Sequence, residues 1–110
     1  MSGGYKLEEE GEVIALTHFV LVKLNNGESC VEIQPRAKEL LSRCVGVIDG
    51  FEAAEVHINC FEREQNYDLM LEMQMKNDQT LKEYLPHRLH KEFVEYLAPK
   101  AASKVTFDRE

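Results

Sequence analysis

Two side chains in the second half of the sequence could carry out acid–base chemistry, the phenol of Tyr84 and the imidazole of His90. Tyr84 shares an apolar stripe with Leu81, three residues before it, and with Leu85, and His90 shares one with Phe93, three residues after it, at the spacing of helical neighbours. We therefore expect both polar groups to point into the protein. An imidazole beside a phenol can take up a proton near neutral pH, as removal of a proton next to a carbonyl group requires.

A third polar side chain, His18, belongs to a segment with the alternation of a strand. It shares one strand face with Val20 and Val22, so it joins Tyr84 and His90 if that face receives the helices. The same residues have a plainer interpretation. A Tyr or His on the inner face of a helix more often forms one hydrogen bond and packs, so catalysis and packing both remain open.

Other kinds of chemistry find little support in the sequence. His87 and His90 lie three residues apart and Glu83 lies four before His87, but Pro86 breaks the helix between them, which argues against a metal site. The sequence has no glycine-rich phosphate loop, no nucleophile elbow and no Trp to shape a haem pocket. We therefore expect no metal ion and no cofactor.

Six segments of regular structure must position these side chains. The first strand is expected over residues 14–24, and Pro35 is expected in the first turn of a helix with these apolar positions: Ile33, Ala37, Leu40, Leu41, Cys44 and Ile48. Further strands are predicted over residues 51–60 and 67–76. A helix near residue 81, capped by Asn77 or Asp78, is interrupted at Pro86 and continues over 87–97, and a short strand follows at 105–107.

The order β-α-β-β-α-β is that of a ferredoxin-like sandwich, an α+β fold with one antiparallel sheet and two helices on one face. The other face of the sheet would carry Phe19, Leu21 and Met70 among polar residues such as Glu72. Such a surface is too apolar to leave in water, so we expect a homodimer in which two sheets face each other.

Length and composition place the chain in a broad class. With 110 residues it fits one domain, predicted over residues 13–110 behind a flexible acidic arm at 1–12. The net charge of -7 argues against nucleic acid as a partner, and no apolar run is long enough to span a membrane. Three cysteines and no secretory signal favour a soluble cytoplasmic protein with reduced, structural thiols.

Three segments resemble the stress-responsive dimeric α/β-barrel family, often called Dabb: LTHFVLVKL (16–24), NYDLMLEMQM (66–75) and the stretch from 81 to 110. The most specific part is similar to the family signature Y-x-x-H-P-x-H-x-x-F, carried here by Tyr84, His87, His90 and Phe93. One departure is visible, since Pro86 precedes His87 instead of following it.

The resemblance implies a ferredoxin-like protomer that pairs sheet to sheet into a dimeric barrel. The family includes plant stress-induced proteins and olivetolic acid cyclase, a cofactor-free polyketide cyclase. The residues that match its catalytic pair are Tyr84 and His90, and the match to His18 lines its pocket, while a further pocket histidine aligns with Leu69. The ligand pocket expected here is lined by His18, Val20, Leu69, Leu71, Leu85 and Phe93.

Two functions follow from these observations. The first is a homodimeric protein that binds a small apolar or carbonyl ligand between sheet and helices. The alternative is a cofactor-independent, polyketide-cyclase-like enzyme in which His90 removes a proton next to a carbonyl group and Tyr84 stabilises the enolate. A cavity of roughly 300 Å³ or more with both residues on its wall favours a binding protein or an enzyme over simple packing.

Overall fold

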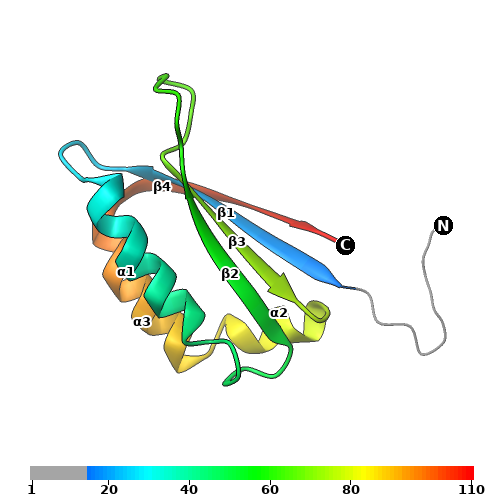
Figure 1. The fold of residues 1–110 in the computed structure, drawn as a ribbon. Coiled ribbons are helices and arrows are strands. Elements are labelled where there is room, and N and C mark those ends of the chain that lie inside the picture. The colour runs from blue at the N-terminus through cyan, green and yellow to red at the C-terminus, as the bar shows by residue number, and fades with distance from the viewer. Residues whose placement is uncertain (1–14) are drawn as a thin grey trace.

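The computed structural model describes residues 15–110, so the predicted arm at 1–12 lies outside the described residues. The elements follow the predicted order with the second helix in two parts (Figure 1): β1 (Leu16–Leu24), α1 (Cys30–Ser42), β2 (Phe51–Ile58), β3 (Leu69–Met75), α2 (Asp78–Tyr84), α3 (Arg88–Leu97), a 3₁₀ turn (Ala98–Lys100) and β4 (Ala101–Arg109). Among these residues no helix is both long and apolar enough to cross a membrane.

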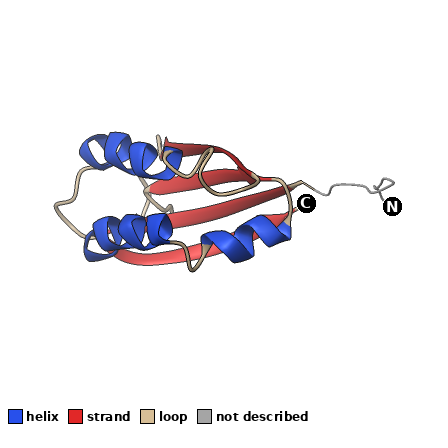
Figure 2. Cartoon of the chain, turned by 90° about the horizontal axis from the view of Figure 1, so that it is seen from below, coloured by secondary structure: helices blue, strands red, loops and turns tan. Residues whose placement is uncertain are grey.

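The four strands form one antiparallel sheet in the order β2-β3-β1-β4. The helices form a layer on one side of it, and Figure 2 looks onto that layer with the strands behind. The prediction of an α+β ferredoxin-like sandwich is confirmed. Strand β1 lies in the middle of the sheet and pairs with both β3 and β4. The side chains on one of its faces therefore contact the helices, and those on the other face lie on the open side of the sheet.

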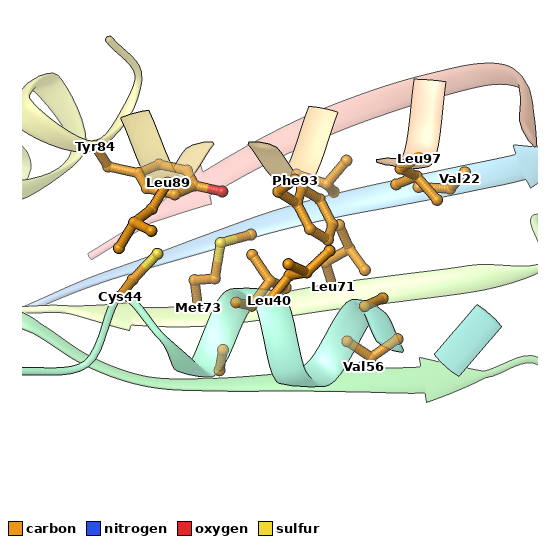
Figure 3. Packing of buried hydrophobic residues seen from close by; sticks show 14 of the residues in the cluster. Val22, Leu40, Cys44, Val56, Leu71, Met73, Tyr84, Leu89, Phe93 and Leu97 are labelled. Carbon is orange, nitrogen blue, oxygen red and sulfur yellow. The ribbon is translucent and has the colours of Figure 1, made fainter. Parts of the chain in front are cut away.

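Strand alternation separates the two faces as predicted. His18, Val20 and Val22 of β1 are buried on the helical side, whereas Phe19 and Leu21 are only half-buried on the other. Figure 3 shows the core side chains of α1 and α3 meeting those of β1 and β3 between the two layers. The core also takes in every apolar position predicted for the first helix: Ile33, Ala37, Leu40, Leu41, Cys44 and Ile48.

The first helix begins one turn earlier than predicted. Ser29 caps it by accepting a hydrogen bond from the backbone N–H of Glu32 at 3.3 Å, so Pro35 lies inside the helix instead of in its first turn. Proline there removes the bond that the carbonyl of Val31 would accept. Val31 is exposed, so water can reach that side of the helix.

The last strand is much longer than the predicted 105–107. It runs over nine residues, and its ladder with β1 extends from the pair Thr17 and Arg109 to the pair Leu24 and Ala101. Polar residues on its helical side conceal this length in the sequence, because only the outer face carries apolar side chains. The strand predicted over 51–60 ends two residues early, at Ile58. The strand predicted over 67–76 begins two residues late, at Leu69.

A close backbone approach fixes the start of α2. Gly50, just before β2, has a φ of +85°, and a Cβ there would collide with the hydroxyl of Thr80. Its carbonyl accepts a hydrogen bond from the N–H of Lys76 at 2.8 Å. The turn before β2 and the first turn of α2 are therefore held in direct contact, and Asn77 caps the helix through the N–H of Thr80.

Candidate functional site

A cavity of about 440 Å³ lies between the helical layer and the sheet. Strands β1, β3 and β4 and helices α2 and α3 supply its walls, which are mostly apolar. It exceeds the volume of about 300 Å³ that separates a binding site from a filled interior, and Tyr84 and His90 both lie on its wall.

The cavity brings together all but one of the residues predicted for the site. Besides Tyr84 and His90 it is lined by His18, Val20, Leu71, Leu85 and Phe93. Leu69 does not line it. It stands at the start of β3, opposite Ile58 of β2, and lines a separate hollow of about 350 Å³ beside the β2–β3 connection.

Tyr84 is the last residue of α2 and is almost fully buried, with 2% of its surface exposed. Its ring centroid lies 5.4 Å from that of Phe51 and 4.5 Å from that of His90. Within residues 15–110 its hydroxyl has no hydrogen-bond partner. Burial, and secondarily the nearby Cys44, raises the pKa of the phenol well above its ordinary value, so the hydroxyl stays protonated and can donate.

The kink between α2 and α3 sets the orientation of His90. Pro86 ends α2, and the Nδ1 atom of His87 caps α3 by accepting a hydrogen bond from the N–H of Leu89 at 3.0 Å. The carbonyl of Leu85 then accepts a hydrogen bond from Nδ1–H of His90 at 2.8 Å. This contact places the proton of neutral His90 on Nδ1 and leaves Nε2 with a lone pair.

His90 is suited to act as a base. Burial lowers its pKa, and Lys104 and His18 lower it further, while the hydrogen bond to Leu85 acts in the opposite direction. The imidazole is therefore neutral at pH 7, and in the described part of the chain its Nε2 atom meets no hydrogen-bond donor. A neutral base and a protonated phenol thus stand with their ring centroids 4.5 Å apart beside the cavity.

His18 links the cavity to β4 through a hydrogen bond between its Nδ1 atom and the carboxylate of Asp108. Its ring centroid lies 6.5 Å from that of Tyr84 in an edge-on arrangement. Sequence reasoning missed Asp108, as it missed Lys104 and Thr106 on the same wall. The available signal was the alternation of 104–108, in which these polar residues share one face and the apolar residues the other.

A stability measurement tests whether the Tyr84 hydroxyl is buried without a hydrogen-bond partner. We expect Tyr84→Phe to raise the free energy of unfolding by about 1 kcal/mol, because it keeps the ring and removes an unpaired buried hydroxyl. Calorimetry should show a melting temperature about 4 °C higher. Tyr96→Phe, on a half-buried ring of α3, serves as the control and should leave it unchanged. A lower melting temperature for Tyr84→Phe would mean that the hydroxyl stabilises the fold.

A family model described as the Stress responsive A/B Barrel Domain matches residues 16–110 of the chain. Comparison with curated proteins finds no match.

Among solved structures, a protein from Arabidopsis thaliana is 18% identical with a TM-score of 0.72, covering 86% of this chain and 93% of that one. A dimeric ferredoxin-like protein of unknown function from Thermobifida fusca is 15% identical with a TM-score of 0.72, covering 96% and 98%. Hydroxynitrile lyase from Passiflora edulis is 10% identical with a TM-score of 0.70, covering 86% and 91%. Likeness at these identities concerns the fold.

Proposed function

The chain belongs to the stress responsive A/B barrel family, and on that basis we propose that it binds a small, largely apolar carbonyl compound in the cavity between sheet and helices. The observation that supports this most directly is the buried hydroxyl of Tyr84, which is a donor without an acceptor among the described residues. A carbonyl oxygen entering the cavity would supply that acceptor. Phe93, Val94 and Leu97 of α3 also line the cavity and offer contact area for an apolar body.

A catalytic function is the second candidate, and the state of His90 favours it. The Nε2 lone pair would take a proton from the carbon next to the carbonyl group, and the C–H electrons would move onto the carbonyl oxygen as an enolate. The hydroxyl of Tyr84 would donate a hydrogen bond to that oxygen as its negative charge develops. This is the cofactor-independent, polyketide-cyclase-like alternative, and one of the similar folds, hydroxynitrile lyase, is an enzyme.

We also propose that two copies of the chain pair through the open face of the sheet. Phe19 and Phe107 pack there with ring centroids 6.4 Å apart, and Phe107 is 62% exposed. Val105 and Leu21 are cross-strand partners and extend the apolar surface. The structure from Thermobifida fusca is described as dimeric, which supports self-association.

A cytoplasmic location is proposed on the state of the cysteines. The three thiols of Cys30, Cys44 and Cys60 are free, and Cys60 is exposed. Exposed free thiols are typical of reducing compartments.

Binding of two matched aromatic probes tests the proposed ligand class. Acetophenone carries a carbonyl group and ethylbenzene has nearly the same shape without one. We expect Tyr84→Phe to weaken acetophenone binding about tenfold, the worth of one good hydrogen bond, and to leave ethylbenzene binding unchanged. Chemical-shift titration of the amide signals around the cavity measures both. If the variant affects the two probes equally, the phenol does not recognise a carbonyl group.

A further inference from the structure

Strand β4 presents its polar residues to the helical side of the sheet. Lys104, Thr106 and Asp108 pair across the ladder with Val22, Val20 and His18, the residues of β1 that face the helices. The outer face of β4 carries Val105 and Phe107 instead. A strand that only covered a core would show the opposite pattern. These three residues are exposed at the edge of the sheet and border the open side of the cavity, where both water and a ligand can reach them.

The cavity has two chemically different sides. Phe93, Val94 and Leu97 of α3 form an apolar wall, whereas Lys104, Thr106 and Asp108 form a polar one. The residues of the polar wall are exposed to water, and Asp108 also pairs with His18. An elongated ligand with an apolar body and a polar end would satisfy both sides.

The charges on the polar wall are not equivalent. Asp108 is engaged by Nδ1 of His18, while Lys104 forms no ion pair within residues 15–110. The positive charge of Lys104 is felt inside the site, since it contributes to the lowered pKa of His90. The protein as a whole carries a net charge of -7, so an anion would be attracted to the cavity only by a local cation such as Lys104.

Tyr84 and Lys104 border different parts of the cavity along the length of β4. Asp108, with its partner His18, marks the end of the cavity near Tyr84, and the His18 and Tyr84 ring centroids are 6.5 Å apart. Lys104 lies four residues further along β4, which corresponds to about 13 Å between Cα atoms in an extended strand. The long side chain of Lys104 spans part of this separation, since its charge acts on His90, whose ring centroid is 4.5 Å from that of Tyr84. A ligand that contacts both Tyr84 and Lys104 would therefore be elongated, with its two polar groups at opposite ends.

We propose that the cavity selects carbonyl compounds that also carry a carboxylate, with the carbonyl oxygen at the hydroxyl of Tyr84 and the carboxylate at the ammonium of Lys104. This inference rests on the proposed binding function and names the ligand class for it. Lys104 would act as a specificity residue, because a charge-assisted hydrogen bond adds more affinity than a neutral one. Thr106, between Lys104 and Asp108 on the same face, offers a further donor to the carboxylate.

Two probes that differ only in charge test this assignment. 4-Acetylbenzoate has a ketone and a carboxylate on opposite sides of a benzene ring, and 4-acetylbenzamide is its neutral counterpart. We expect wild-type protein to bind the carboxylate about tenfold more tightly than the amide, and Lys104→Gln to abolish that preference. Added salt should weaken carboxylate binding and leave amide binding unchanged. Chemical-shift titration measures all of these affinities.

Control variants keep the outcomes distinct. Lys91→Gln removes the same charge from an exposed position on α3 outside the cavity lining and should leave the preference intact. If Tyr84→Phe weakens both probes while Lys104→Gln changes neither, the carbonyl site stands and the carboxylate assignment is wrong. If neither probe binds wild-type protein in the cavity, the proposed function fails and this inference fails with it.

Discussion

Phe107→Asp is expected to convert the proposed dimer into single protomers at micromolar concentration. The side chain lies on the open face of the sheet beside Phe19, where a second copy would enclose it. The substitution removes a large aromatic contact and places a carboxylate in an apolar interface without a partner, which costs several kcal/mol. We expect the dimer dissociation constant to rise at least a hundredfold, as measured by sedimentation equilibrium.

The exposure of Phe107 makes this test specific for association. Because the residue is 62% exposed in the protomer, Asp at this position should leave the free energy of unfolding of a single chain nearly unchanged. Val31→Asp is the matched control, since Val31 is 74% exposed on α1, in the helical layer. Wild-type protein that sediments as a single chain, or a Phe107→Asp protein that stays paired, would show that this face does not mediate a dimer.

His90→Asn is expected to lower proton exchange at a ketone by about 10² to 10⁴, if the protein acts as an acid–base catalyst. The reaction is exchange of the methyl protons of acetophenone in deuterated water, followed by proton NMR. The amide N–H of asparagine lies close to the position of Nδ1–H, so it can still donate to the carbonyl of Leu85 while the basic nitrogen is removed. The loss should therefore appear in the exchange rate and not in the folding of the chain.

The pH profile of the same reaction identifies the base. His90 must be deprotonated to act, and because burial holds its pKa below the ordinary 6.5, the rate should rise at acidic pH and be flat from about pH 7 upward. His87→Asn is the control, because asparagine can keep the helix cap. Wild-type exchange no faster than buffer would reject the catalytic function and leave ligand binding in place.

Much of the fold can be predicted from the sequence because strand and helix periodicities are strong in its middle. The alternation of Leu69, Leu71, Met73 and Met75 places a complete strand face in the core. Asn77 is also predicted as a helix cap, and its side chain accepts a hydrogen bond from the N–H of Thr80. The ends of elements are predicted less well, because the cap at Ser29 begins α1 a turn earlier than the proline suggests.

The candidate site is only partly visible in the sequence. Local spacing places Tyr84 and His90 on inward stripes, and strand alternation adds His18. The alternation of 104–108 indicates that Lys104 and Asp108 share one face, but it does not show that this face borders the cavity. That depends on the ladder between β1 and β4, which joins residues about 90 positions apart. Leu69 belongs to the predicted site but not to the cavity, because the alternation of its strand predicts its face and not its position along the cavity.

The contact between Gly50 and Thr80 acts on the cavity from outside it. Thr80 lies one helical turn before Tyr84, and a short helix moves nearly as a rigid rod. A methyl group at residue 50 would displace the hydroxyl of Thr80 and press on the Cβ atoms of Lys76 and Thr80; where the first turn of α2 moves to relieve this contact, the phenol at the other end of the helix shifts with it. A glycine far from any ligand atom would in this way govern the reach of the hydroxyl into the binding space.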